Sequence, residues 1–372
     1  MRVAFQIDQL WFSAPGGIGT YVWELVEAFD AIGEPELTLF RCRFDGESAR
    51  GFTREHETVV VPSSIRQLYP TWNLLGRPAL PERAANAEIV HATNPASVPP
   101  AAERQALVVT VHDLAFDRFP ELFPRSWRTL YRTGARAAVK RAHVLLVPTR
   151  ATMDDLVERG ADADRIRVTP LASSLPAGDL VPGEVAAAHG IAGPFILCAG
   201  TLEPRKNQVR LIRAYRQVAR EVPHALVLAG PDGWLMDDLE REIERSGPGT
   251  IVRTGRLDAD QLDALYRAAD LVAYPSLYEG FGLAIVEAMA RGVPVVTSTT
   301  PACAEVAGDA ALLVDPLDVA GLADALARAL TDEALRADLS RRGLERAAGY
   351  SWQATARATL DAYRDAVRRA HA

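Results

Sequence analysis

The sequence is poor in cysteine and has no long apolar run. Its three cysteines among 372 residues are Cys42, Cys198 and Cys303. The number is odd, and the last two lie among apolar or small residues, as reduced buried thiols do. We therefore expect no disulfide framework and a cytoplasmic setting. No apolar run reaches about 18 residues, and the first apolar segment, 3–7, carries a glutamine, so the sequence predicts neither a spanning helix nor a signal peptide.

Positive charge is not in excess either. Lys and Arg total 41 against 48 Asp and Glu, which gives a formal net charge of −7. This balance argues against nucleic acid as the main partner, because proteins that bind duplexes need a surplus of cations. Lysine itself is rare, since Lys140 and Lys206 are the only two. The length suggests two domains of an ordinary globular protein.

Short apolar runs alternate with helical patterns along the whole chain. In the first half we expect strands near 2–7, 36–42, 58–61, 88–91, 106–111, 143–147 and 166–169, and helices near 18–31, 125–141 and 150–159. After a proline- and glycine-bearing linker at 172–194, we expect strands near 195–199, 225–229, 250–254, 271–274, 293–297 and 311–314, each followed by a helix. A last helix is expected from Trp352 to about residue 370. The fold class is therefore α/β, with two doubly wound parallel sheets that bind ligands at the carboxyl ends of their strands, in the cleft between domains.

The most informative segment spans residues 271–298, where a strand is followed by a glycine-bearing loop, a helix and a second strand. Because Gly280 and Gly282 have no side chains, three backbone N–H groups can point at one spot beside a helix N-terminus. These N–H groups belong to Phe281, Gly282 and Leu283. Such a spot suits a phosphate group.

Two glutamates flank this loop. Glu279 lies in the loop and Glu287 about one turn inside the helix, and each carboxylate can accept hydrogen bonds from vicinal hydroxyls such as those of a ribose. One anion site between two hydroxyl acceptors describes a nucleotide-sugar. Two glutamates at this spacing can equally be solvated surface residues, but the glycines between them favour a binding site.

A second phosphate-binding element is predicted at GTLEPRKN, residues 200–207. Arg205 and Lys206 follow an expected strand and stand just before a helix that begins near residue 208, so two cations can meet one diphosphate. The alternative is that both are exposed charges near a helix N-terminus, which the helix dipole mildly disfavours.

The segment PGGIG, residues 15–19, follows the first expected strand and leads into a helix from about residue 19 or 20. Its glycine spacing differs from the G-x-G-x-x-G of dinucleotide-binding folds, and no acidic residue ends the next strand, so a dehydrogenase is disfavoured. Gly16 and Gly17 allow the backbone to approach a ligand. A plain strand–helix turn is the alternative.

Together these segments resemble glycosyltransferase family 4, a large family of retaining enzymes that carry an E-x7-E signature on the two-domain GT-B fold. The resemblance covers nearly the whole chain and looks most like bacterial mannosyltransferases. The matching segments, in the order of the family, are GGIGTYVWEL (16–25), TVHDLAF (110–116), GTLEPRKN (200–207), VLAGPDG (227–233), the E-x7-E segment (279–287) and EVAGDAALLVDP (305–316).

The resemblance implies transfer of a hexosyl group, with mannosyl as the first choice, from a nucleoside-diphosphate sugar to a hydroxyl of a glycan or lipid-linked glycan acceptor. It implies retention of anomeric configuration and a role in surface polysaccharide or glycolipid assembly. Arg205 and Lys206 are expected to neutralise the donor pyrophosphate, and the loop of Gly16 and Gly17 to approach the donor. The catalytic group is expected to include Glu279.

The resemblance also assigns roles to polar residues after two expected strands. His112 is expected to contact the donor sugar, or to stabilise the positive charge at the anomeric carbon through its backbone carbonyl. Asp113 is expected to orient that histidine or to approach the acceptor hydroxyl. His91 and Asn94 are candidates for acceptor contacts. From the residues alone, a histidine after a strand is more often structural.

No metal ion or cofactor is expected. Two D-x-D triplets occur, at 162–164 and 258–260, but Asp258 has the position of a helix N-cap and the first triplet lies in a turn. In place of a divalent ion, Arg205, Lys206 and the helix N-terminus at Gly282 are expected to carry the departing diphosphate.

Basic residues gather on the helix expected at 125–141. Five of them recur every three or four residues and therefore share one stripe: Arg125, Arg128, Arg132, Arg136 and Lys140. The stripe is either a solvated cationic face or a surface for anionic lipid or a lipid-diphosphate acceptor. The protein is thus expected free in the cytoplasm or attached to the inner face of a membrane.

The expected domains are 1–175 for the acceptor, 176–355 for the nucleotide-sugar, and a helix at 356–372 that returns to the first domain. Three other functions compete with glycosyl transfer. The first is a nucleotide-sugar epimerase of the related two-domain fold. A phosphorylase is disfavoured, because its pyridoxal group needs a lysine and Lys206 is the only lysine of the second half. The third is a nucleotide-sugar-binding subunit without turnover.

Overall fold

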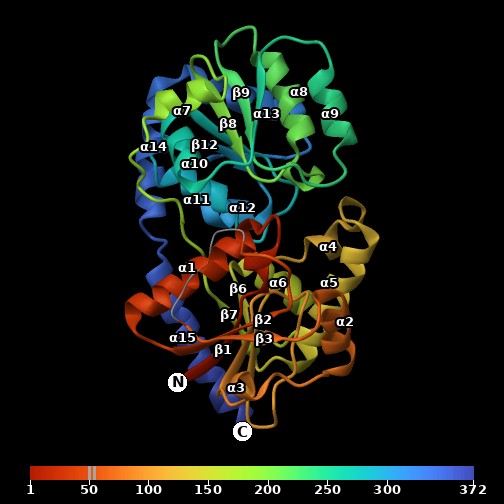
Figure 1. The fold of residues 1–372 in the computed structure, drawn as a ribbon. Helices are drawn as coiled ribbons and strands as arrows, with labels where there is room; N and C mark the ends of the chain where they lie inside the picture. Colours follow the sequence, from red (N-terminus) through yellow and green to blue (C-terminus); the bar gives the residue numbers. More distant parts are fainter. Residues whose placement is uncertain (49–51, 53–55) are drawn as a thin grey trace. The chain divides into compact units, whose positions relative to one another are not determined.

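The computed structural model describes residues 1–48, 52 and 56–372 and divides the chain into two compact units. Unit 1 comprises Met1–Leu171 together with Trp352–Ala372, and unit 2 comprises Ala172–Ser351. Each unit is a parallel sheet with helices packed on it (Figure 1). The predicted α/β class with two doubly wound sheets is confirmed. No helix among the described residues is long and apolar enough to cross a membrane.

The sheet of unit 1 has, within the described residues, seven parallel strands in the order β3-β2-β1-β4-β5-β6-β7. They are β1 (Arg2–Gln6), β2 (Glu36–Cys42), β3 (Thr58–Val61), β4 (Ile89–Ala92), β5 (Ala106–Thr110), β6 (Val144–Val147) and β7 (Ile166–Val168). The inner strands are short apolar runs buried on both faces, as in parallel sheets that helices cover on both sides. All seven expected strands are confirmed.

Helices pack on both faces of this sheet. They are α1 (Gly16–Ile32), α2 (Ile65–Leu75), α3 (Glu82–Ala85), α4 (Ala115–Arg118), α5 (Arg125–Arg141), α6 (Arg150–Glu158) and α15 (Trp352–Ala370). Side chains alternate along β1, so Phe5 meets Phe29 of α1 with ring centroids 6.3 Å apart, and Phe29 in turn meets Tyr363 of α15. Ala4 faces the other way, into the core that includes Trp72 of α2.

The sequence patterns missed α2, α3 and α4. In α2 the cause is Pro70, which lies inside the helix and lacks the N–H that would bond to the carbonyl four residues earlier. Pro70 is exposed, so water can satisfy that carbonyl, while Leu68 and Trp72 bury the opposite side. The helices α3 and α4 are single turns, too short for a periodic pattern to show.

The sheet of unit 2 has six parallel strands in the order β10-β9-β8-β11-β12-β13, all of them expected from the sequence. They are β8 (Phe195–Ala199), β9 (Ala225–Ala229), β10 (Ile251–Gly255), β11 (Leu271–Tyr274), β12 (Val295–Ser298) and β13 (Leu312–Val314). The helices are α7 (Pro182–Ala188), α8 (Gln208–Val218), α9 (Asp237–Glu244), α10 (Ala259–Ala268), α11 (Leu283–Met289), α12 (Pro301–Ala307), α13 (Val319–Thr331) and α14 (Glu333–Ala347). On one face of the sheet, α8 and α13 share a core.

The linker expected at 172–194 is wrong in part, because it contains the helix α7. Pro182 occupies the first turn of α7, where its missing N–H costs nothing, and Val185 to Ala188 follow without a break. The helix ends before Gly190, whose φ of +73° is left-handed. Proline and glycine in this stretch therefore mark the ends of a helix and not a continuous linker.

Each sheet reverses its strand order beside its first strand. In unit 2 the reversal lies between β8 and β11, and in unit 1 it lies between β1 and β4. In open α/β sheets, ligands bind at the carboxyl ends of the strands at such a reversal. The segments that leave β8 and β11 at this end are 200–207 and 275–282, which both carry predicted site residues.

Candidate active site

The GTLEPRKN segment is hydrogen-bonded to the loop that follows β11. After β8 the chain makes one 3₁₀ turn at Pro204–Lys206, and Asn207 takes a left-handed conformation with φ 61°. The Nδ2 atom of Asn207 donates to the carbonyl oxygen of Pro275 at 3.0 Å. The backbone N–H of Leu277 donates to the carbonyl oxygen of Arg205 at 2.8 Å. The two predicted phosphate-binding segments thus form one structure at the strand-order reversal.

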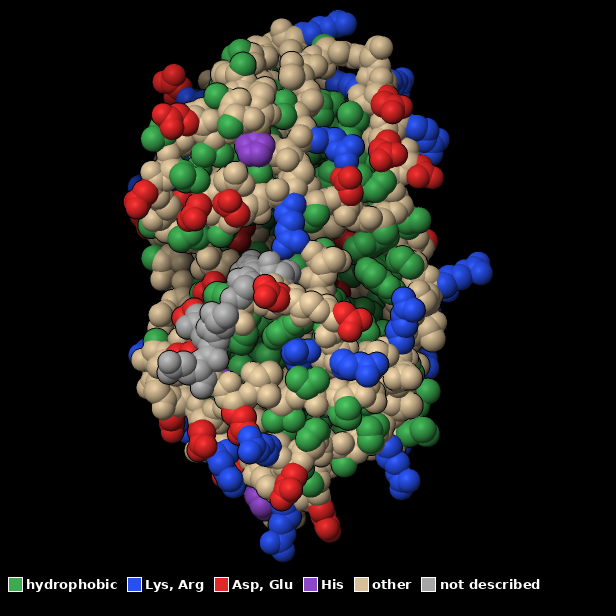
Figure 2. All heavy atoms as spheres, in the orientation of Figure 1, with side chains coloured by type: hydrophobic (Ala, Val, Ile, Leu, Met, Phe, Trp, Pro, Cys, Tyr) green, Lys and Arg blue, Asp and Glu red, His purple; other side chains and the backbone are tan. Residues whose placement is uncertain are grey.

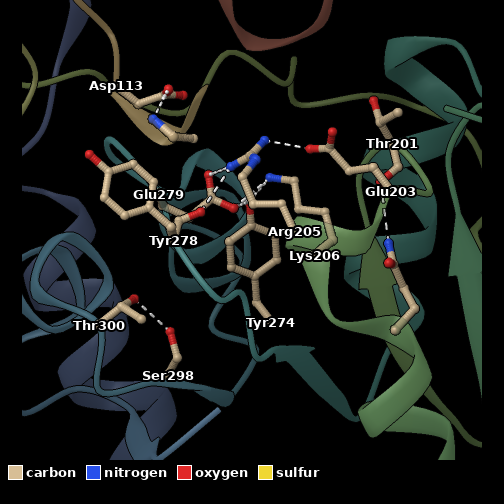
Figure 3. Close-up of polar contacts among 12 residues, drawn as sticks. Asp113, Thr201, Glu203, Arg205, Lys206, Tyr274, Tyr278, Glu279, Ser298 and Thr300 are labelled. Atoms are coloured by element: carbon tan, nitrogen blue, oxygen red, sulfur yellow. Dashed lines mark hydrogen bonds and ion pairs between the residues drawn. The ribbon is translucent and has the colours of Figure 1, made fainter. Parts of the chain in front are cut away.

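Four charged side chains meet there (Figure 3). Arg205 lies between two carboxylates, because Nη1 donates to Oε2 of Glu279 at 2.8 Å and Nη2 donates to Oε1 of Glu203 at 2.5 Å. Lys206 Nζ donates to Oε1 of Glu279 at 2.7 Å and to the hydroxyl of Tyr274. The four charged side chains are at most 13% exposed. We call these four residues the ion cluster. Its two positive and two negative charges cancel.

The ion cluster fixes the protonation state of its members. Burial alone would raise the pKa of Glu279, but Arg205 and Lys206 together lower that pKa to about 2, so the carboxyl group is ionised. Burial and ionised Glu279 raise the pKa of Tyr274 well above its usual value, so its hydroxyl keeps the proton that it donates to Glu279 at 2.9 Å. In this structure the carboxylate that we expected to face a polyol binds two cations.

Gly282 begins α11 in a conformation that other residues rarely adopt. Its φ is +96°, and a Cβ atom at this position would lie 2.9 Å from Cδ1 of Ile285. Phe281 is only 4% exposed, and its ring packs edge-on against Tyr350. Phe281 therefore offers backbone to a ligand and not its side chain. The N–H of Leu283, the first residue of α11, has no partner within the helix, as at any helix start.

Glu287 lies on α11 and has a different partner from Glu279. Its Oε2 atom accepts a hydrogen bond of 3.0 Å from the hydroxyl of Tyr266 on α10. Glu279 and Glu287 are each 8% exposed. The alternative that these two glutamates are solvated surface carboxylates is therefore wrong.

In unit 1, His112 follows β5 as a neutral imidazole. Its Nε2 atom lies 2.9 Å from the carbonyl oxygen of Thr93. Because a carbonyl oxygen can only accept, Nε2 carries the proton and Nδ1 keeps its lone pair. Burial lowers the pKa of His112 to about 4, so the ring is uncharged at physiological pH. The ring packs edge-on against Tyr21 at 4.8 Å.

Asp113 and Asn94 bind the backbone of their own turns. Oδ1 of Asp113 accepts from the backbone N–H of Ala115 at 2.9 Å, at the start of α4. Oδ1 of Asn94 accepts from the N–H of Ala96 at 2.8 Å. The carbonyl of Thr93, and not the carboxylate of Asp113, is the hydrogen-bond partner that orients His112.

His91 is fully buried and both of its ring nitrogens have protein partners. Nδ1 lies 2.6 Å from the hydroxyl of Tyr363 on α15, and Nε2 lies 2.7 Å from Oγ1 of Thr110. Burial lowers the pKa of His91 to about 3. We expected His91 to contact the acceptor, but in this structure both of its ring nitrogens are bonded to protein side chains. The residue instead joins β4 and β5 to α15.

The helix α1 begins at Gly16, earlier than expected, because Pro15 already has helical dihedral angles and its carbonyl accepts from the N–H of Gly19. Gly16 and Gly17 are exposed, and a Cβ atom on Gly16 would meet open space. A Cβ atom on Gly19 would lie 2.3 Å from that of Pro15. Packing requires Gly19, whereas Gly16 and Gly17 leave backbone open to a ligand.

Comparison with known proteins decides the family. The model described as Glycosyltransferase Family 4 matches residues 15–172, and the model described as Glycosyl transferases group 1 matches residues 187–346. The chain is 34% identical over 268 residues to O-antigen chain mannosyltransferase B of Escherichia coli, a match that covers 69% of this chain and 70% of that protein. The chain belongs to glycosyltransferase family 4.

Other similar proteins are matched over a smaller share of their length or at a lower identity. The D-inositol 3-phosphate glycosyltransferase of Nocardia farcinica is 34% identical over 253 residues, in a match that covers 63% of this chain and 55% of that protein. HepE of Anabaena, solved with UDP and glucose, is 19% identical with a TM-score of 0.74 over 97% of this chain and 98% of that one. WaaG, a glycosyltransferase involved in lipopolysaccharide biosynthesis, has a TM-score of 0.71 at 19% identity, over 96% of this chain and 98% of that one. These likenesses show that the fold is GT-B.

Four residues of this glycosyltransferase were missed by the sequence patterns although they hold predicted site residues. They are Glu203, Asn207, Tyr266 and Tyr274. The first two lie inside the quoted GTLEPRKN segment, where a glutamate two residues before Arg205 was the one available signal of an ion pair. Tyr266 lies in α10 and Tyr274 in β11, where an aromatic side chain fits the apolar pattern and gives no sign of a polar partner.

Proposed function

We propose that this protein transfers a hexosyl group, mannosyl in the first instance, from a nucleoside-diphosphate sugar to a hydroxyl of a glycan or lipid-linked glycan. Unit 2 binds the donor and unit 1 binds the acceptor. The observation that carries the proposal is the ion cluster at the strand-order reversal of unit 2, next to the glycine-started helix α11. The name of the Escherichia coli relative supports mannose and polysaccharide assembly.

In this proposal the donor diphosphate lies against Lys206, Arg205 and the backbone N–H groups of residues 281–283. Glu279 holds both cations in place before the donor arrives and keeps its charge at any physiological pH. Because the cations are already ordered, no side-chain entropy is lost at binding, and their fields act on the departing diphosphate as its charge develops. Glu287 accepts hydrogen bonds from the ribose of the donor.

The neutral ring of His112 has a different part in the proposal. Its Nδ1 lone pair can accept a hydrogen bond from a hydroxyl of the donor sugar, and the proton on Nε2 is held by Thr93. A ring with a pKa of about 4 adds no positive charge beside an anomeric carbon that becomes positive in the transition state. Asp113, Gly16 and Gly17 contribute to the acceptor side or to the approach of the donor.

Thermal shift against GDP-, UDP-, ADP- and dTDP-sugars tests the donor. A ligand at 100 times its dissociation constant adds about 2.7 kcal/mol to the free energy of unfolding, so one nucleotide should raise the melting temperature well above the other three. A transfer assay with the selected donor and a mannan-type acceptor follows. Four flat titrations would contradict a nucleotide-sugar site.

The proposal also includes retention of the anomeric configuration and turnover without a metal ion. Within the described ranges, no three His, Cys, Asp or Glu side chains are placed to share a metal ion, and Lys206 and Arg205 supply the positive charge that the diphosphate needs. Proton NMR of the first product formed should show the anomeric configuration of the donor. Turnover should be the same in EDTA and in magnesium, and inversion or a requirement for the ion would contradict these two parts.

Two other functions are separated from this one by simple assays. An epimerase would convert the nucleotide-sugar with no acceptor present, and a binding subunit without turnover would neither transfer nor hydrolyse the donor. Lys206, Glu279 and Glu287 are all ordered in a buried site, which supports a catalytic protein. Release of nucleoside diphosphate only in the presence of acceptor is the result that glycosyl transfer predicts.

We also propose that unit 1 contacts an anionic membrane through α5. Of the basic stripe, Arg125, Arg136 and Lys140 are exposed, while Arg132 is paired with Asp117 at 2.8 Å. The stripe is therefore narrower than the sequence predicts. On the face of the molecule in Figure 2, acidic and basic side chains are interspersed, so attraction has to come from local clusters such as this one.

The neighbouring helix α2 adds apolar side chains to this surface. Leu74 and Leu75 are each 69% exposed at the end of α2, and Arg141 of α5 donates to the carbonyl of Trp72 at 2.8 Å, which places the two helix ends together. Exposed leucines beside cations favour contact with an anionic lipid surface.

Co-sedimentation with vesicles tests the membrane contact. Binding to vesicles that contain phosphatidylglycerol should exceed binding to neutral vesicles, and Lys140→Glu with Arg136→Glu should remove the difference. The control is Arg241→Glu with Arg328→Glu, the same charge change at two side chains of unit 2 that are 74% and 59% exposed. Equal binding to both vesicle types, or none, would contradict the contact.

A further inference from the structure

A residue on one face of α10 is hydrogen-bonded to the side chain of Glu287. The hydroxyl of Tyr266 donates to Oε2 of Glu287 at 3.0 Å, and the tyrosine is fully buried. Burial and the charge of Glu287 raise the pKa of Tyr266 well above its usual value, so the hydroxyl is a permanent donor. A carboxylate oxygen that accepts this hydrogen bond has a fixed direction, and the other oxygen then faces a defined side.

The same face of α10 also holds the backbone of Glu287. Asp263, one turn before Tyr266, is 1% exposed, and its Oδ1 accepts from Nε of Arg291 at 2.9 Å. Arg291, just beyond the end of α11, donates through Nη1 to the carbonyl oxygen of Glu287 at 3.3 Å. Side chain and main chain of Glu287 are thus both tied to α10, one directly and one through Arg291.

Asp263 has further partners that make this arrangement rigid. Its Oδ2 accepts from Nε of Arg267 at 2.7 Å, and Arg291 donates to Oγ of Ser173 and to the carbonyl of Leu175, both at 2.8 Å. Arg267 donates to the carbonyls of residues 178 and 180. The first residues of unit 2 are therefore fixed to the same buried carboxylate as the end of α11.

From this geometry we infer that Tyr266 is a positioning residue of the donor site, which orients Glu287 toward the two hydroxyls of the donor ribose, with Asp263 as its support. The inference rests on the proposed function, because it takes Glu287 as the ribose acceptor. Tyr266 itself touches no ligand. Its hydroxyl selects for a ribose diol by holding one carboxylate oxygen so that the other meets the hydroxyls.

The test measures discrimination between nucleotides with and without the diol. GDP or UDP, whichever binds more tightly to the unaltered protein, is titrated calorimetrically beside its 2′,3′-dideoxy analogue. Tyr266→Phe removes only the hydroxyl, and we expect affinity for the ribonucleotide to fall about 10-fold, as for a lost hydrogen bond to a charged acceptor. Affinity for the dideoxy analogue should stay unchanged. Asp263→Asn should reduce the same ratio by a smaller factor.

A matched control is available in the same unit. Tyr215 is also buried, and its hydroxyl donates to the carbonyl of His224 at 2.8 Å, with no contact to Glu287. Tyr215→Phe should lower the melting temperature and leave the ratio of the two affinities unchanged. An equal loss of both affinities in Tyr266→Phe, or no loss in either, would overturn the inference, because a merely structural tyrosine gives that result.

Glu287→Gln separates failure of the inference from failure of the proposed function. If this variant loses the discrimination and Tyr266→Phe keeps it, Glu287 binds the ribose without help from Tyr266, and only the inference fails. If Glu287→Gln keeps the discrimination, or if neither GDP nor UDP binds the unaltered protein, the proposed donor site fails and the inference fails with it.

Discussion

At the carboxyl ends of their strands, the two sheets hold polar side chains in opposite states of charge. In unit 2 the ion cluster keeps full charges, with the pKa of Glu279 lowered to about 2 by its cations. In unit 1 the corresponding residues, His91 and His112, are neutral rings, the first fully and the second partly buried, with their pKa values lowered to about 3 and 4. Both sheets are doubly wound and parallel, so the chemistry of the ends does not follow from the fold.

The difference agrees with a division of labour between the units. An anionic diphosphate needs cations that are fixed in advance, and their counter-ions must then be buried with them. A sugar hydroxyl needs only neutral donors and acceptors, which an uncharged imidazole supplies. Substitutions that exchange or remove charge should therefore affect unit 2 far more than unit 1.

The largest effect is expected from the lysine of the ion cluster. Lys206→Ala should lower the turnover number by about 10²–10³, since one preorganised charge on the leaving group is lost. Circular dichroism should show an intact fold. Lys140→Ala, at the only other lysine of the chain, is the matched control and should keep normal turnover in detergent-free assays with a soluble acceptor. Near-normal turnover of Lys206→Ala would sink the proposed role.

The next effect concerns stability. Glu279→Gln leaves Arg205 and Lys206 buried without the carboxylate that binds both, and we expect a loss of about 3 kcal/mol in the free energy of unfolding of unit 2. Urea unfolding followed by hydrogen exchange in unit 2 measures it. The control is Glu345→Gln, at an exposed pair with Arg341, where the change should stay within about 0.5 kcal/mol. Equal effects of the two substitutions would mean that the ion cluster adds no stability.

The pH dependence of stability should differ between the units. Free histidine has a pKa of 6.5, and the folded values of His91 and His112 are lower, so the unfolded state binds more protons below pH 6.5. Stability of unit 1 is then complete above pH 6.5 and falls on acidification by up to about 1.4 kcal/mol per pH unit for each ring. The shift of Glu279 acts only between its free value of 4.5 and about 2. Between pH 6.5 and 5 the lowered pKa of His224 gives unit 2 a loss of its own. The two rings act on unit 1, where the lowered pKa of His143 adds to the loss and the raised pKa of buried Asp8 opposes it.

Tryptophan fluorescence in urea measures this loss, because Trp11, Trp23, Trp72, Trp127 and Trp352 lie in unit 1 and Trp234 alone in unit 2. His112→Gln should reduce the slope between pH 6.5 and 5 by less than half, since His91 and His143 remain with lowered pKa values. A slope that this variant leaves unchanged would show that the pKa of His112 is not lowered in the folded protein.

The smallest effect on stability is expected from the network of hydrogen bonds between uncharged side chains in unit 1. The hydroxyl of Thr110 lies 2.7 Å from Nε2 of His91 and 2.9 Å from the hydroxyl of Tyr21. Thr110→Val keeps the shape and removes these bonds, which should cost about 1–2 kcal/mol. Thr129→Val, at an exposed hydroxyl on α5, is the control and should change stability by less than about 0.5 kcal/mol. A Thr110 variant as stable as this control would show that the network is not stabilising.

Sequence patterns predicted the strands well because buried parallel strands are short apolar runs between turns, as in 195–199 and 271–274. They also predicted that the segments with Lys206 and Glu279 adjoin, since both follow strands of one sheet. They missed α2 because of Pro70, and α7 because proline and glycine form its first turn.

Pairwise side-chain contacts were beyond the reach of the patterns. Nothing in the local sequence of Tyr266 or Glu203 states that their partners are Glu287 and Arg205, because Tyr266 and Glu287 lie on different helices and the burial of Glu203 depends on the packing of a loop. The same holds for His91, whose partner Tyr363 is far away in the chain. Period and propensity describe elements, and such contacts depend on how elements pack.

The helix α15 has a consequence for the order of assembly during synthesis. Unit 1 is built from two segments that the whole of unit 2 separates, and Tyr363 of α15 contacts both Phe29 and His91. A ribosome releases residues 1–171 long before it makes α15, so the nascent sheet waits with an apolar face uncovered while unit 2 can already fold. The helix α15, made after unit 2, is thus the element that completes the core of unit 1.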